Sequence, residues 1–203
     1  MGVDKVILKA VLSTLAAVFL LFAFMFVALI GLYPATMMEL TYDLGMDSSS
    51  IKYAKRAYNR SNDVYYMAYA TEVAIGLNDY EKIEECGEKL IADDEFADYC
   101  ATANESLPET ATITYDQYVY GQVCVSKYEI GKKTEAVERA FELVEGSFPR
   151  GNAVVAVLYS ALGEEDSDTV TVIEGKMKQL SIENFSNEEK EYIKQVFVQI
   201  NRG

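Results

Sequence analysis

The chain contains no histidine in its 203 residues. Histidine is the usual general base near neutral pH, a member of the Ser-His-Asp triad and the commonest protein ligand of transition metals, so its absence excludes most sites of these kinds. The motifs G-x-S-x-G, G-x-x-x-x-G-K-[ST] and G-x-G-x-x-G are also missing. We therefore expect no catalytic residue, no metal site and no cofactor, and a protein that is not an enzyme.

Carboxylates are the chemistry that remains, and they gather in two clusters, DDE at residues 93–95 and EEDSD at residues 164–168. A pair of carboxylates can act as general acid and base, which leaves a carboxylate-based hydrolase as a remote alternative. Neither cluster has the glycine and closing glutamate of an EF-hand calcium loop. Both lie at predicted helix starts, where free backbone N–H groups and the helix dipole stabilise negative charge. We interpret them as helix-start residues.

Cysteine is scarce and odd in number: Cys86, Cys100 and Cys124, with no C-x-x-C spacing. Outside the cell two of them can form a disulfide and leave one free, whereas inside the cell all three are expected as small buried side chains. We favour buried thiols, and the cysteines do not determine the compartment.

Charge is absent from AVLSTLAAVFLLFAFMFVALIGLYPATMM, which runs from Ala10 to Met38. Because about 20 helical residues suffice to cross a bilayer, we predict a transmembrane helix over residues 10–35. A short tail at 1–9 precedes it, and a connection at 36–47 leads to a domain at 48–203.

A cleaved signal peptide is an alternative to this anchor, because Lys5 and Lys9 form a basic start. The apolar run, however, exceeds the roughly 7–15 residues of a signal core, and no A-x-A site follows it. A buried helix of a soluble protein is a third interpretation. With an uncleaved anchor, Lys5 and Lys9 predict a cytoplasmic N-terminus and an extracytoplasmic C-terminal domain. Lys52, Lys55 and Arg56 lie near the limit of the distance over which that rule counts.

The chain is acidic, with 18 basic and 32 acidic residues, and all but three of these 50 lie beyond residue 35. Nucleic acids and anionic membrane faces attract positive protein surfaces. The acidity therefore argues against nucleic acid, and against an anionic membrane face, as the partner of the domain.

Apolar residues spaced three and four apart predict nine amphipathic helices after the connection. Capping-box spacings at Asn78, Thr114 and Ser186 mark three of their starts. In residues 152–173, NAVVAVLYSAL and TVTVI also fit strands, which leaves a small α+β domain as an alternative. The nine predicted helices lie within residues 51–58, 64–74, 80–91, 96–103, 118–128, 137–144, 154–161, 170–180 and 193–200.

The helices also show a repeat. Three apolar residues, Val137, Phe141 and Val144, are each followed by another apolar residue 36 positions later, although Ala140 is followed by Lys176. This spacing predicts helix pairs with a period in the mid-thirties and one extra helix, near 96–103, inserted after the first pair.

The pair over residues 118–149 resembles the tetratricopeptide (TPR) repeat family, on Gly131, Glu135-Ala136-Val137, Ala140 and Pro149. Gly121 stands where the family uses a small residue for close helix contact. The resemblance implies an all-α fold, a TPR-like α-solenoid of antiparallel helix pairs, here with a C-terminal capping helix, and a role in binding other proteins.

Tyrosine is unusually frequent, with fifteen residues against no tryptophan. Tyrosine offers a large contact area and a polar hydroxyl, which suits peptide recognition. We predict a partner groove at Tyr65, Tyr69, Glu72 and Tyr120, although core packing also explains tyrosines. The expected function is a single-pass membrane scaffold that binds proteins or peptides at the membrane surface through residues 48–203 and contacts the lipid bilayer through residues 10–35. A structural accessory subunit of a larger membrane complex is the alternative, since Ala10, Ser13, Ala16, Ala17 and Ala23 form a small-residue face.

Overall fold

The computed structural model describes residues 3–144 and 146–201, and within them it contains eleven helices and no strand. The all-α prediction is confirmed, and the α+β alternative is wrong, because residues 153–163 and 167–178 are both helical. The helices are α1 (Val3–Leu32), α2 (Pro34–Asp43), α3 (Asp47–Ser61), α4 (Val64–Gly76), α5 (Tyr80–Ile91), α6 (Phe96–Glu105), α7 (Tyr115–Glu129), α8 (Lys133–Glu142), α9 (Ala153–Gly163), α10 (Ser167–Lys178) and α11 (Asn187–Ile200).

The helices divide into two compact units, α1–α3 and α4–α11. The division falls between Asp63 and Val64. Helix α3, expected as the first helix of the C-terminal domain, thus groups with the apolar N-terminal helix.

Helix α1 is long and apolar enough to cross a membrane over Ile7–Leu32, a stretch of 26 residues with a mean hydropathy of 2.9. Its apolar window is entirely unburied within the protein. A membrane anchor and a signal sequence share these properties. The helix ends at Leu32 rather than near residue 35, because Tyr33 precedes Pro34 and a residue before proline is disfavoured in the helical region.

Residues 36–47 are predicted to be a connection, but most of them are helical, because α2 extends from Pro34 to Asp43. Pro34 occupies its first turn, where a missing N–H costs nothing. Met37, Met38 and Thr41 are buried on the side that packs on α3, whose own buried residues include Ile51 and Ala54. The apolar start of α2 was counted with the span, because the sequence has no charge at which to separate them.

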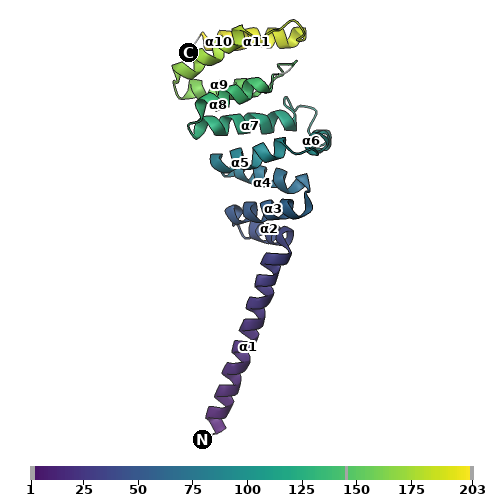
Figure 1. Cartoon of the computed structure of the whole chain (residues 1–203), viewed down its shortest axis with the longest axis vertical. Coiled ribbons are helices and arrows are strands. Elements are labelled where there is room, and N and C mark those ends of the chain that lie inside the picture. Colours follow the sequence, from purple (N-terminus) through teal and green to yellow (C-terminus); the bar gives the residue numbers. More distant parts are fainter. Residues whose placement is uncertain (1–2, 145, 202–203) are drawn as a thin grey trace. The chain divides into compact units, whose positions relative to one another are not determined.

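The second unit is built from consecutive helix pairs, which Figure 1 shows in successive layers. Helix α4 packs on α5, α7 on α8, and α9 on α10. Helix α7 also contacts α5 and α9, so it joins neighbouring pairs. Helix α6 is the additional helix after the first pair, and it packs on α4 and α7, whereas α11 packs on α10. These pairs, with the inserted helix, are the ones that the period predicts.

Two of the three predicted capping boxes are confirmed. In one, the Ser186 N–H donates to Glu189 Oε2 at 2.8 Å; in the other, the Thr114 N–H donates to Gln117 Oε1 at 3.3 Å. At the third start the cap lies one residue later than predicted: Asp79, and not Asn78, caps α5 and accepts from the Lys82 N–H. Asn78 instead has a φ of 53°, a left-handed conformation that asparagine tolerates better than most residues.

Helix α5 approaches α7 most closely at Gly87. A Cβ atom at Gly87 would lie 2.3 Å from Val123 Cγ2, whereas a Cβ at Gly121 would lie 3.6 Å from the Ala156 side chain, an ordinary contact. Val123 is fully buried, and its branched side chain has few rotamers to move into. The absence of a side chain at Gly87 is therefore a condition of this helix contact.

We predict opposite effects for alanine at these two glycines. Glycine inside a helix costs roughly 0.5–1 kcal/mol relative to alanine, so Gly121→Ala should raise the free energy of unfolding by about that amount. Gly87→Ala should lower it by about 1 kcal/mol or more, because overpacking costs typically 1–3 kcal/mol. Denaturant unfolding of the full chain in detergent, with Gly121→Ala as the matched control, measures both. Equal stabilisation by the two changes would contradict the close contact.

Candidate functional site

The second unit carries a hollow of about 680 Å³ beside the start of α7. Glu72 of α4 and the rings of Tyr115 and Tyr118 of α7 line one part of it, and residues 107–114, the segment between α6 and α7, line the rest. A smaller hollow of about 380 Å³ involves the same segment together with Gln117 and Arg150. We call the first hollow, with Tyr99 behind it, the tyrosine site.

The segment that borders the tyrosine site is held where it joins α7. At the start of α7, the Tyr115 N–H donates to Asn104 Oδ1 of α6 at 2.7 Å. Ile113 lies against Gly151, which has a φ of +83°. A Cβ atom at Gly151 would approach Ile113 Cγ2 to 2.1 Å, so the segment rests directly on backbone. These contacts give the hollow a defined wall.

A hydrogen bond across the fold organises the aromatic side of the site. The Tyr115 hydroxyl donates to Glu72 Oε1 at 2.7 Å, and the Tyr99 ring packs edge-on to Tyr115 with 5.7 Å between centroids. Burial and the Glu72 carboxylate raise the pKa of Tyr115, Tyr99 and Tyr118 above the usual value. The three phenols therefore remain neutral donors at physiological pH, beside a carboxylate that accepts.

The structure places the four predicted groove residues in two locations. Tyr65, Tyr69 and Glu72 share α4, where the rings of Tyr65 and Tyr69 lie 6.4 Å apart. Tyr120 packs edge-on to Phe96 of α6, with 5.8 Å between centroids, and is absent from the lining of the hollow.

Sequence reasoning missed three members of the site: Tyr99, Tyr115 and Tyr118. Tyr115 and Tyr118 are three apart, which places them on one side of α7. That spacing was available as a signal. Tyr118 is only partly buried in the structure.

The carboxylate clusters serve the helix starts, as predicted. Asp166 caps α10, accepting from the Thr169 N–H at 3.1 Å, and it also accepts from the Tyr128 hydroxyl at 3.0 Å and from Lys133 Nζ at 2.8 Å. The Lys133 and Thr169 hydrogen bonds hold the pKa of Asp166 well below its usual range. In the other cluster, Asp93 Oδ1 accepts from the Glu95 N–H at 2.9 Å, directly before α6.

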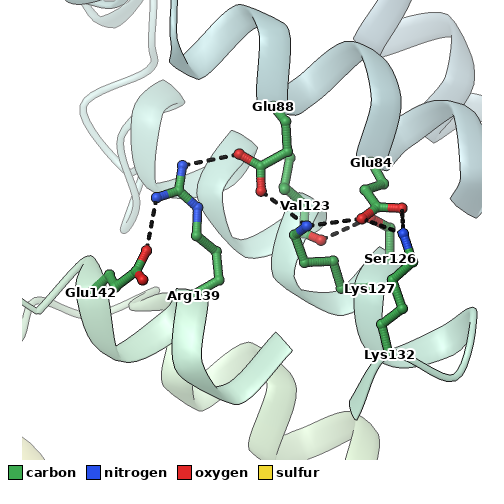
Figure 2. A network of polar contacts seen from close by, with 8 residues as sticks. All are labelled: Glu84, Glu88, Val123, Ser126, Lys127, Lys132, Arg139 and Glu142. Carbon is green, nitrogen blue, oxygen red and sulfur yellow. Dashed lines mark hydrogen bonds and ion pairs between the residues drawn. The ribbon is translucent and has the colours of Figure 1, made fainter. Parts of the chain in front are cut away.

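The densest ionic network joins α5 to α7 and α8 (Figure 2). Lys127 of α7 contacts Glu84 at 2.8 Å and Glu88 at 3.2 Å, with only 11% of its side chain exposed. Lys132 also binds Glu84, and Arg139 of α8 binds Glu88 at 3.0 Å.

Burial alone opposes the charged forms in this network, but the ion pairs more than offset it. The result is a lowered pKa for Glu84 and a raised pKa for Lys127. Glu142 pairs with Arg139 within α8, and the other charges of the network pair with opposite charges on a neighbouring element. We therefore interpret it as a structural clamp between helix pairs.

The three cysteines are buried and form no disulfide, as favoured by the sequence. Burial raises the pKa of Cys100 and Cys124 to about 12, so both remain protonated thiols. Within residues 3–144 and 146–201 no group of three or more histidine, cysteine or acidic residues has the arrangement of a metal site.

The fold and site define an all-helical protein with an apolar N-terminal helix and an aromatic hollow. Comparison with known proteins finds no match among family models, curated proteins or solved structures. The TPR resemblance thus stays a prediction from the residues.

We predict that Asp166 contributes to stability in a pH-dependent way. Asp166→Asn removes the charged partner of Lys133 and Tyr128 and should cost about 1–3 kcal/mol at pH 7. Because the folded-state pKa is lowered, this stabilisation is complete above the unfolded pKa of about 3.9 and is lost as pH falls below it. The stability gap between wild type and variant should therefore narrow in acid.

The measurement is denaturant unfolding of the full chain between pH 7 and pH 3. Asp168→Asn, an exposed acid in the first turn of the same helix, is the matched control and should change stability little. A gap for Asp166→Asn that is constant across this range would contradict the assignment.

Proposed function

We propose that the protein is a single-pass membrane-anchored scaffold whose helices α4–α11 form a TPR-like α-solenoid that binds a peptide segment of another protein at the tyrosine site. The observation that carries the proposal is the hollow of about 680 Å³ bounded by neutral phenols and the Glu72 carboxylate. Aromatic side chains concentrate binding energy at peptide interfaces, because they bury large areas with few rotatable bonds.

The chemistry of the site favours a segment with an apolar residue and a basic residue. Apolar lining is supplied by Leu107, Pro108 and Ile113, and Leu107 and Ile113 are about one-third exposed. Glu72 is exposed and directs one carboxylate oxygen to Tyr115. Its second oxygen is suited to accept from an arginine, a lysine or a backbone N–H of the partner.

The anchor gives this binding site its location. An uncleaved α1 keeps the scaffold at the membrane surface and raises its effective concentration toward partners there. From Lys5 and Lys9 before the span we propose a cytoplasmic N-terminus and an extracytoplasmic C-terminal domain. The basic residues of α3, near the other end of the span, favour the opposite orientation.

The test is site-specific photocrosslinking of the full-length chain in its native membrane. A benzophenone amino acid replaces Tyr118 in the hollow or, as matched control, Tyr159, which is 52% exposed on α9. We expect a discrete adduct from position 118 and none from position 159. Glu72→Gln should lower the adduct yield about tenfold or more, because a charge-assisted hydrogen bond is worth roughly 1.5–3 kcal/mol.

Two further arms separate the proposal from its alternatives. Tyr115→Phe removes the hydroxyl but keeps the carboxylate, so the adduct should persist. Placing the crosslinker at Ala17 in α1 tests the accessory-subunit function. An adduct formed only from Ala17, or equal adducts from positions 118 and 159, would contradict binding at the tyrosine site.

A further inference from the structure

Basic charge is concentrated in one helix of an otherwise acidic protein. Helix α3 contains Lys52, Lys55, Arg56 and Arg60 against a single acid, Asp47. Residues 64–203, by contrast, contain 27 of the 32 acidic residues of the chain and 12 of its 18 basic residues. The acidity that disfavours an anionic membrane face as partner therefore belongs to residues 64–203, and α3 does not share it.

Three of these basic residues form a row on α3. Lys52, Arg56 and Arg60 are four apart and all exposed, so they follow one side of the helix. The buried residues of α3, which include Ile51 and Ala54, occupy the side that packs on α2. Lys52 and Arg56 thus face away from α2 and toward the surroundings.

The row begins where the apolar helix ends. Arg60 Nη1 donates to the backbone carbonyl of Leu32 at 2.6 Å, and Leu32 is the last residue of α1. Only Tyr33 separates α1 from α2. Figure 1 shows α2 and α3 running across the end of α1 rather than continuing its axis. A bilayer crossed by α1 would therefore have its headgroup region beside this hairpin.

Apolar side chains are exposed at the same end of the unit. They surround α2 and the turn into α3: Tyr33 57%, Leu40 42%, Tyr42 52%, Leu44 65% and Met46 51% exposed. Water is a poor environment for so many adjacent apolar groups, whereas aromatic and aliphatic side chains are favoured at the membrane boundary. Glu39 and Asp43 lie about a quarter turn round α2 from Leu40 and Leu44, so they can remain in water.

We propose that the α2–α3 hairpin is a lipid-binding element that lies in the headgroup region of the bilayer crossed by α1. Lys52 and Arg56 bind the phosphates of anionic phospholipids, and Leu40 and Leu44 insert at the acyl boundary. Arg60 links the hairpin to the end of the span through Leu32. This inference rests on the proposed anchoring of α1, and it commits to the lipid surface of that same bilayer as the occupant.

The absence of tryptophan provides a clean probe, because a single introduced tryptophan is the only one in the chain. The full-length Leu44→Trp protein is reconstituted into vesicles of phosphatidylcholine with phosphatidylglycerol that carry a doxyl quencher near the headgroup. We expect blue-shifted emission that the quencher strongly reduces. Tyr159→Trp, at a similarly exposed position in α9, should emit as in water and resist quenching.

The charge requirement is tested by Lys52→Gln with Arg56→Gln. Each basic residue near an anionic surface raises the ratio of docked to undocked hairpin by a factor of about 5, so the loss of this pair should lower that ratio about 25-fold. Pure phosphatidylcholine vesicles should lower it in wild type as well. The control pair Lys178→Gln with Lys194→Gln, on exposed side chains of α10 and α11, should leave quenching unchanged.

Co-flotation of the protein with the vesicles separates the two proposals. Failure to float would overturn the anchor and, with it, the docking that depends on it. Flotation with an unquenched Leu44→Trp would leave the anchor standing and overturn the docking. If quenching in neutral vesicles, and in the Lys52→Gln/Arg56→Gln variant, is as strong as in wild type with anionic vesicles, the assignment of anionic headgroups is overturned.

Discussion

The account depends on the apolar helix α1, which the rest of the protein does not cover. Ile7–Leu32 has a mean hydropathy of 2.9 and none of its apolar window is buried. Apolar surface in water costs about 25 cal/mol per Å², and this stretch is long and apolar enough to cross a membrane, as a membrane anchor or a signal sequence is. At the end of α1, the Leu32 carbonyl accepts a hydrogen bond from Arg60, which connects this helix to α3.

Most of the helices were predictable from the sequence, because a helix that buries one side has apolar residues that recur about every 3.6 positions. The period predicts that α7 is a helix but does not predict which of its residues are buried, because α7 contacts α5, α8 and α9 and buries Val119, Val123 and Cys124 on more than one side. The period fails at α2, whose apolar start continues the composition of the span without a break. In both places the tertiary neighbours, and not the local pattern, decide which residues are buried.

The candidate site was only partly predictable. The high tyrosine content led to a predicted groove on α4, and of its residues there Glu72 lines the hollow. The hydrogen bond from Tyr115 to Glu72 spans 43 positions in sequence, and the ring of Tyr99 arrives from the inserted helix α6. No local spacing encodes such contacts. Tyr120 is also a tyrosine of α7, like Tyr115. Its side chain leaves the helix in a different direction and packs against Phe96.

The protein thus combines an uncovered apolar helix, a basic hairpin at its end and an acidic helical unit with an aromatic hollow. The intact mass of the protein in carbonate-washed membranes tests the central claim most directly. We predict that the chain resists extraction and has its full mass of 22.7 kDa, with α1 retained. A chain shortened by α1, or one recovered in the carbonate supernatant, would contradict the account.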